Sequence, residues 1–156
     1  MLHEAGCTGG QCLRGSPPVL ADRGLADSLG SIAGWSAAQL LAAAGSTGME
    51  GASPRLTAAP AGASLDHGAA SGVLVTGPGV TLEGSFVVSG LVVATGDLTL
   101  AGNAQVFGGV VVPGDSGFAV TIAGGAQVLR SACALEWARI AIPPRPGRER
   151  SWMAWP

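Results

Sequence analysis

The sequence contains no lysine and no tyrosine, and aromatic residues make up only 4% of its 156 residues. Glycine, by contrast, occurs 26 times. Any core must therefore consist of thin layers of Val, Leu, Ile and Ala. The eight arginines are outnumbered by ten carboxylates, which leaves a net charge of −2. This balance argues against a protein that binds nucleic acid through a general attraction for phosphate.

Long apolar runs are also missing. No stretch approaches the roughly 18 to 20 apolar residues that a membrane-spanning helix needs. Residues 1–12 lack the basic start and the apolar centre of a secretory signal. We therefore expect contact with a membrane only through an anchor that this chain does not contain.

Residues 1–71 are rich in Gly, Ala and Pro, and we expect them to be irregular apart from one short helix. The stretch 45–71 is interpreted as a linker, because its composition buries too little surface to order itself. The helix is predicted near 36–44. Ser36 and Gln39 match the capping box that starts a helix.

The end of this helix is predicted from Gly45, which suits the left-handed residue that follows a helix. Its buried side is expected to contain Leu40, Leu41 and Trp35.

Between residues 72 and 130 the pattern changes, and glycine recurs every sixth position, at 84, 90, 96, 102, 108 and 114. The second and fourth positions of each hexad are apolar, so they are expected to share one face of a strand. The second positions are Val80, Phe86, Val92, Leu98, Ala104 and Val110, and the fourth positions are Leu82, Val88, Ala94, Leu100, Val106 and Val112. The third positions, which are expected to face outward, are Thr81, Val87, Val93, Thr99, Gln105 and Val111.

A hexad of this kind predicts an all-β fold, a β-solenoid (β-helix), with turns at Gly84, Gly90, Gly96, Gly102 and Gly108. Three faces per coil give 18 residues per turn and roughly three coils over 72–130. The alternative is an antiparallel sheet of hairpins, but the Asn-Gly and Asp-Gly turns that hairpins prefer do not occur in the chain.

Residues 131–156 are predicted to form a capping helix followed by a basic tail rich in Pro and Trp. Ser131 would start the helix, and Leu135, Trp137 and Ile140 would cover the apolar end of the stack. Such a cap is expected because an open end exposes unpaired strand edges. The tail has a net charge of +3 over 130–156, and we expect Trp152 and Trp155 to pack on the flank of the solenoid.

The residues that could carry chemistry are isolated. His3 and His67 are the only histidines, and both lie in Gly-rich segments that we expect to be irregular, so we expect exposed loop histidines. The dipeptide Asp66-His67 does not complete a Ser/His/Asp arrangement. The remaining acidic residues of the repeat fall singly on its corners, at Glu83, Asp97 and Asp115. We therefore predict no enzymatic activity, no catalytic residue, no metal, no cofactor and no small-molecule substrate.

Three cysteines leave the disulfide state open. Cys7 and Cys12 enclose a four-residue spacer, and Cys133 lies far along the chain. A disulfide could join Cys7 to Cys12, or Cys133 to either of them, if the protein reaches an oxidising compartment. The spacing Cys-x4-Cys, which contains no histidine, does not indicate a zinc site.

Residues 71–112, SGVLVTGPGVTLEGSFVVSGLVVATGDLTLAGNAQVFGGVVV, resemble the Gly-punctuated C-terminal β-region of bacterial PilX-type pilus assembly proteins. The ending is similar as well, in RSACALEWA, the Pro/Arg stretch and RERSWMAW. Acyltransferases also have Gly hexads, but they require a histidine between coils, and 72–130 contains none.

The resemblance implies a structural component of a type IV pilus or pseudopilus, whose partners are other subunits of that assembly. The family also has a pilin-like apolar N-terminal helix, which this chain lacks, so we expect either the distal part of a longer protein or a misplaced start. A full-length protein with that helix would face the periplasm or the cell surface, whereas this chain alone would be cytoplasmic. The alternative function is a cytoplasmic, polymer-forming β-helix similar to bactofilins.

The outward-facing Val87, Val93 and Val111 indicate that something covers this side of the solenoid, either a neighbouring subunit or the helix near 36–44.

Overall fold

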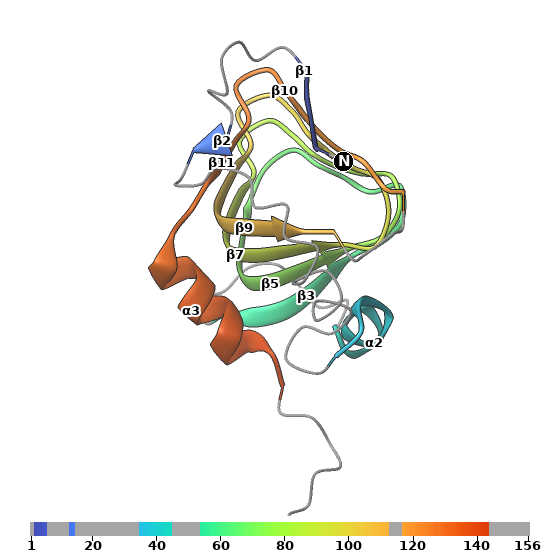
Figure 1. Cartoon of the computed structure of the whole chain (residues 1–156), viewed down its shortest axis with the longest axis vertical. Coiled ribbons are helices and arrows are strands. Elements are labelled where there is room, and N and C mark those ends of the chain that lie inside the picture. The colour runs from blue at the N-terminus through green and yellow to red at the C-terminus, as the bar shows by residue number, and fades with distance from the viewer. Residues whose placement is uncertain (1, 6–12, 15–34, 45–53, 113–116, 144–156) are drawn as a thin grey trace, which may run out of the picture.

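The computed structural model describes residues 2–5, 13–14, 35–44, 54–112 and 117–143. These residues form parallel strands that wind around one core, and helices that pack on the outside (Figure 1). The helices are α2 (Ala37–Ala43) and α3 (Ala132–Ala141). The strands are β1 (Leu2–Ala5), β2 (Leu13–Arg14), β3 (Arg55–Ala59), β4 (Ser64–Leu65), β5 (Ala69–Thr76), β6 (Val80–Leu82), β7 (Val87–Ala94), β8 (Leu98–Leu100), β9 (Gln105–Val111), β10 (Val120–Ala123) and β11 (Gln127–Leu129).

The strands form two parallel sheets, ordered β1-β10-β8-β6-β4 and β2-β11-β9-β7-β5-β3. Val87 in β7 pairs with Ala69, 18 positions earlier, and with Gln105, 18 positions later. The paired residues of β8 and β10 are 22 positions apart in the sequence, since Leu98 pairs with Val120, and we call this separation the advance from one coil to the next. The stack has about four turns. The predicted β-solenoid is therefore confirmed, with one coil more than we expected. The predicted turns at Gly90 and Gly108 were wrong, because these glycines lie inside β7 and β9, and the strands form two sheets instead of three separate faces.

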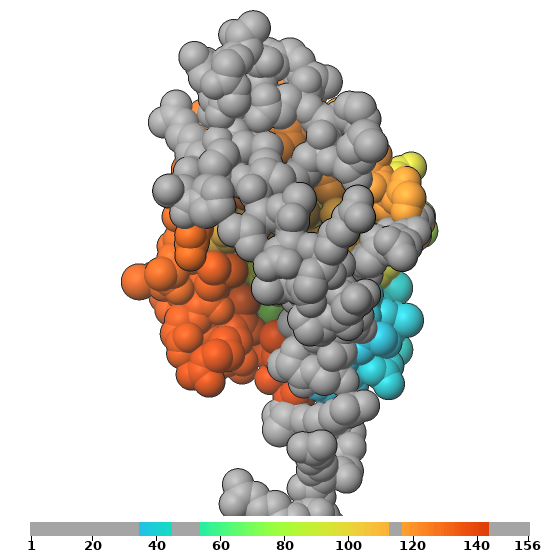
Figure 2. Space-filling view, viewed as in Figure 1, coloured from blue at the N-terminus to red at the C-terminus, as the bar shows by residue number. Residues whose placement is uncertain are grey.

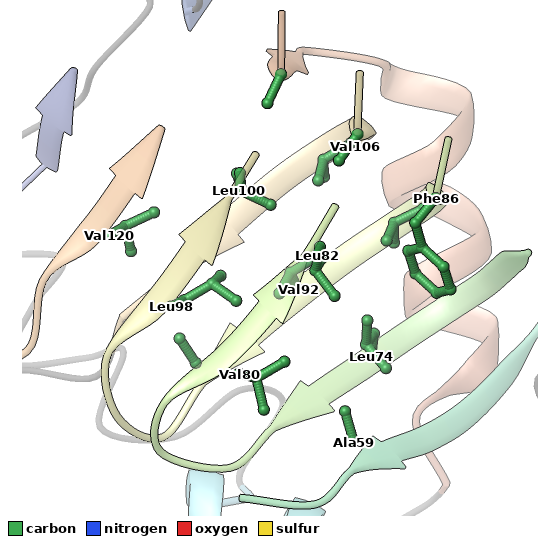
Figure 3. Packing of buried hydrophobic residues seen from close by; sticks show 14 of the residues in the cluster. Ala59, Leu74, Val80, Leu82, Phe86, Val92, Leu98, Leu100, Val106 and Val120 are labelled. Atoms are coloured by element: carbon green, nitrogen blue, oxygen red, sulfur yellow. The ribbon is translucent and has the colours of Figure 1, made fainter. Parts of the chain in front are cut away.

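The interior of the stack consists of the apolar residues predicted to face inward. All twelve second and fourth positions of the hexads belong to the core or pack against it. Figure 3 shows Leu74, Val80, Leu98 and their neighbours on successive strands pointing into the same interior. Phe86 is the only aromatic side chain among the fully buried ones of the described residues. Thin aliphatic layers are what the scarcity of aromatic residues predicts.

The outer face of the sheet formed by β3, β5, β7 and β9 is also apolar, and both helices cover it. Val73, Val75 and Val93 point away from the interior and are buried against Leu40 of α2 and Ala138 of α3. Trp35, just before α2, donates a hydrogen bond from Nε1 to the carbonyl oxygen of Pro143, just after α3 (3.1 Å). The cover expected over Val93 is therefore supplied by α2 and α3 of the same chain.

The start of α2 follows the predicted capping box. The Ser36 hydroxyl accepts a hydrogen bond from the Gln39 backbone N–H (3.2 Å), and the Gln39 side chain accepts one from the Ser36 N–H (2.9 Å). Leu40 is buried, and Trp35 and Leu41 pack beside it. Gly45, predicted to end the helix, lies outside the described residues.

The linker interpretation of 45–71 was wrong for its second half. Arg55–Ala59 pairs in parallel with Gly72–Thr76, and Ser64–Leu65 pairs with Thr81–Leu82, so these residues form an additional coil. The composition argument failed because the backbone partners and the apolar contacts of this coil are supplied by the following coil. Small side chains such as Ala59, which is fully buried, are sufficient in such a thin layer.

The predicted irregularity of the N-terminus was also wrong, and so was the predicted placement of the C-terminal helix over the end of the stack, although this helix begins after Ser131 as predicted. β1 pairs with β10 and β2 pairs with β11, so the first residues of the chain continue the end of the stack that α3 was expected to cover. α3 lies along the side instead, against β5, β7 and β9 (Figure 1). Ala134 and Ala138 face the sheet, whereas Trp137 and Ile140 face outward. Small residues on the buried side allow the helix to approach the sheet closely.

Candidate functional site

Two carboxylates of the coils accept hydrogen bonds from neighbouring coils. Ser64 donates a hydrogen bond to Glu83 one coil further on. Asp97 accepts one through Oδ1 from the backbone N–H of Ala119 (2.9 Å). Both carboxylates therefore tie successive turns together. Asp115, the third corner carboxylate, lies outside the described residues.

Asp66 and His67 are in contact, but both side chains are exposed to solvent. The side chain of His67 is 83% exposed and that of Asp66 is 67% exposed. An exposed pair offers neither the desolvation nor the third group that a catalytic histidine requires. Among the described residues, no three His, Cys, Asp or Glu side chains gather closely enough to hold a metal ion. His3 lies in β1, at a position paired with Thr121.

The cysteines are not brought together in the part of the chain that the structure describes. Cys133 is exposed on α3 and has a free thiol. Cys7 and Cys12 lie outside the described residues, so the pairings between them and Cys133 stay predictions.

The outward face of α3 gathers the exposed apolar side chains of the described residues. Trp137 is 46% exposed and Ile140 is 62% exposed, and Cys133 stands one turn before Trp137 on the same side of the helix. We call these three residues the α3 stripe. The surface of α3 lies on the outside of the molecule in Figure 2. Apolar side chains of this size on an exposed helix face are typical of a contact with another protein.

An ion pair runs beside the α3 stripe. Arg139 donates a hydrogen bond through Nε to Oε1 of Glu136 (2.8 Å), and both side chains are exposed. This hydrogen bond lowers the pKa of Glu136 and raises the pKa of Arg139. The pair is screened by solvent, so it marks a polar border of the stripe more than a source of stability.

The opposite sheet has a different outer face, made of hydroxyl groups. Ser64, Thr81, Thr99 and Thr121 are register partners in consecutive strands. This column of hydroxyl residues was not recognised in the sequence, although Thr81 and Thr99 occupy the third position of their hexads. Hydroxyl groups can face water, whereas Val73, Val75 and Val93 cannot do so without cost. The difference explains why both helices pack mainly on the sheet that contains those valines.

Comparisons of the chain with known protein families, curated proteins and solved structures gave no match. None of the described helices is long and apolar enough to cross a membrane. The candidate functional surface of the described residues is the α3 stripe.

Proposed function

We propose that this chain is a non-enzymatic structural component, the distal domain of a type IV pilus or pseudopilus accessory protein. The proposal combines the resemblance of residues 71–112 and of the C-terminal ending to PilX-type proteins with the shape of the fold. A stack of parallel coils with one continuous core is a rigid body. In such a body, function lies in what the outer faces touch.

The observation that carries the proposal is the α3 stripe. Trp137 and Ile140 are large apolar residues that the fold leaves exposed although the helix buries Ala134 and Ala138. A contact centred on Trp137 would gain most from desolvation, because tryptophan is among the residues that dominate protein interfaces. The partners are other subunits of the pilus or pseudopilus.

The test uses the thiol within the stripe. Cys7 and Cys12 are replaced by serine, so that Cys133 is the only cysteine, and a photoactivated crosslinker is attached to it. The labelled chain is illuminated together with purified type IV pilus subunits, and adducts are identified by mass spectrometry. We expect an adduct with a pilus subunit, and we expect it to be lost in a variant carrying Trp137→Ser and Ile140→Ser.

The matched control carries Glu136→Gln and Arg139→Gln, which change the polar border of the same helix but leave the stripe intact. This control should retain the adduct. An adduct that the stripe variant also forms, or the absence of any pilus subunit among the adducts, would contradict the proposal.

The second candidate function is a cytoplasmic polymer-forming β-helix of bactofilin type. It is favoured by one observation, namely that β3 and β4 are the terminal strands of their sheets at one end of the stack. Terminal strands can template pairing with another chain. Electron microscopy of the purified protein separates the two functions, because only the second predicts unbranched filaments one solenoid wide.

A further inference from the structure

The end of the stack that follows β10 and β11 is completed by residues from the start of the chain. Leu2–Ala5 pairs with Val120–Ala123 over four register positions, and Leu13 and Arg14 pair with Val128 and Leu129. All these pairings are parallel, like those between the other coils. The β10–β11 end is therefore a surface that accepts parallel strands, and residues 2–5 and 13–14 of the N-terminal segment 2–14 occupy it.

The occupant fits this end less closely than the coils fit one another. Val120 and Val128 are eight residues apart, whereas their partners Leu2 and Leu13 are eleven apart. Six residues of the segment are paired, as many as in the pairings of β8 with β10 and of β9 with β11 together, but β1 and β2 are the terminal strands of their sheets. A short terminal coil with few pairs is the kind of element that opens locally before the rest of a fold.

The connection between this segment and the rest of the chain is long. The order of the sheet places β2 five strand positions from β3, which is about 24 Å at the usual spacing of strands. Helix α2 packs on β3 and β5, so the chain returns to the opposite end of the stack. Twenty residues separate Arg14 from Trp35, and an extended chain of that length reaches about 65 Å. A chain of this length is therefore long enough to span the 24 Å more than twice, and we call residues 15–34 the tether.

We propose that the β10–β11 end binds the N-terminal segment 2–14 of a second copy of this chain, in exchange for its own. The hydrogen bonds are made by main-chain groups, so the segment of a second copy offers the same donors and acceptors in the same register. Reciprocal exchange between two copies satisfies both ends and closes into a symmetric dimer. In the intact chain, the covalent connection favours pairing within one copy in dilute solution.

The first experiment removes this advantage by shortening the tether. Deletion of residues 16–32 leaves three residues between Arg14 and Trp35. A connection of this length reaches only about 14 Å, which is less than the stack requires. We expect the shortened chain to be a dimer of twice the chain mass by size-exclusion chromatography with light scattering. The unmodified chain at the same concentration should be monomeric. A shortened chain that keeps its β circular dichroism and stays monomeric would overturn the proposal.

A matched control separates strand exchange from other association. His3→Pro and Glu4→Pro remove two consecutive backbone donors in β1, so at least one donor that faces β10 is lost whichever residue provides it. In the shortened chain these substitutions should restore the monomer. A dimer that persists would mean that the copies meet elsewhere, for example through the α3 stripe, and the proposal would be wrong.

The second experiment does not depend on the folding of the shortened chain. A fluorescent peptide of residues 1–14, kept reduced, is titrated into the full-length chain that carries His3→Pro and Glu4→Pro. This variant has an impaired segment of its own, so it should bind the peptide at least about tenfold more tightly than the unmodified chain does. Equal binding by both chains, or no binding, would contradict the proposal. Neither experiment involves pilus subunits, so the outcome is independent of the proposed function.

Discussion

The carbonyl oxygen of Gly72 occupies the place where a side chain of Gly90 would begin. A Cβ atom on Gly90 would lie 1.8 Å from this oxygen, and Gly90 has a φ of +148°. The relationship recurs one coil later, where a Cβ on Gly108 would lie 1.9 Å from the carbonyl oxygen of Gly90. Within β5, β7 and β9, three stacked glycines therefore set how closely successive coils approach.

We expect Gly90→Ala to destabilise the fold by about 2 kcal/mol or more. The added methyl group meets backbone that cannot move aside without separating the coils, and the positive φ adds strain. The matched control is Gly79→Ala, because Gly79 has a φ of +69° but no atom within 4 Å of its Cβ position. Its cost should be limited to about 1 kcal/mol. Equal losses of unfolding free energy in the two variants, measured with denaturant, would show that the close contact is unimportant.

Gly96 illustrates a different reason for glycine in the same repeat. Unlike the other predicted turn glycines, Gly96 does not have a positive φ. A Cβ atom on Gly96 would nevertheless lie 2.5 Å from the Cα atom of Pro78. We expect Gly96→Val to lower the unfolding free energy by about 1 to 3 kcal/mol through overpacking alone. Trimming the contact with Pro78→Gly should recover part of the loss that thermal unfolding measures for Gly96→Val. No recovery would mean that the cost has another origin.

The docking of α2 depends on one leucine. Leu40 is fully buried against the outer face of the sheet. We expect Leu40→Ala to cost about 2 to 5 kcal/mol, the usual range for a large-to-small change in a core. Ile140→Ala removes a similar volume from the α3 stripe and should leave the unfolding free energy within about 0.5 kcal/mol of the unmodified chain. Comparable losses in the two variants would place Ile140 in a packed environment.

Truncation after Arg130 is expected to cause association, and the structure indicates through which surface. Removal of α3 uncovers the valines at 73, 75 and 93, whereas the β10–β11 end keeps its pairing with β1 and β2. Light scattering should therefore report large irregular assemblies. Replacing Val73 and Val93 by threonine in the truncated chain should reduce them. Ordered filaments insensitive to these substitutions would show instead that residues 131–156 protect the end of the stack.

The pair of Glu136 and Arg139 predicts a small pH dependence. Because the hydrogen bond from Arg139 lowers the pKa of Glu136, its contribution to stability is present above the ordinary pKa of glutamate and is lost as the pH falls through the lowered value. The melting temperatures of the unmodified chain and of Glu136→Gln should therefore converge in acid. At neutral pH the gap should be small, because the pair is exposed. A gap that widens on acidification would contradict the assignment.

The alternation within the hexads was sufficient to predict the core. Val80 and Leu82, for example, are both fully buried, because period-two alternation and a fixed turn leave the side chains of a coil no other arrangement. Leu56 and Ala59 were not recognised as part of a strand, because their segment has no glycine at the hexad positions and depends on its neighbour for hydrogen bonds.

The placement of α3 on the side of the stack could not be predicted from the sequence, for a similar reason. An Ala-rich face and a face with Trp137 and Ile140 are both apolar, and only the tertiary structure decides which of them packs on the sheet. Leu135, Trp137 and Ile140 were therefore predicted to cover the end of the stack, whereas Trp137 and Ile140 are exposed on the side. Its use in assembly stays a prediction.

The longer advance between β8 and β10 has a consequence for how such a chain can change over generations. Val111 keeps the 18-residue register with Val93, but Val120 pairs with Leu98 at a distance of 22 residues, so four additional residues enter between Val111 and Val120. Strand pairing resumes beyond them in the other sheet, where β10 pairs with β8. A corner that admits extra residues while the strands keep their partners lets new loops be acquired without rebuilding the interior. Lineages could diversify their surface at this point, and an engineered epitope could be inserted there.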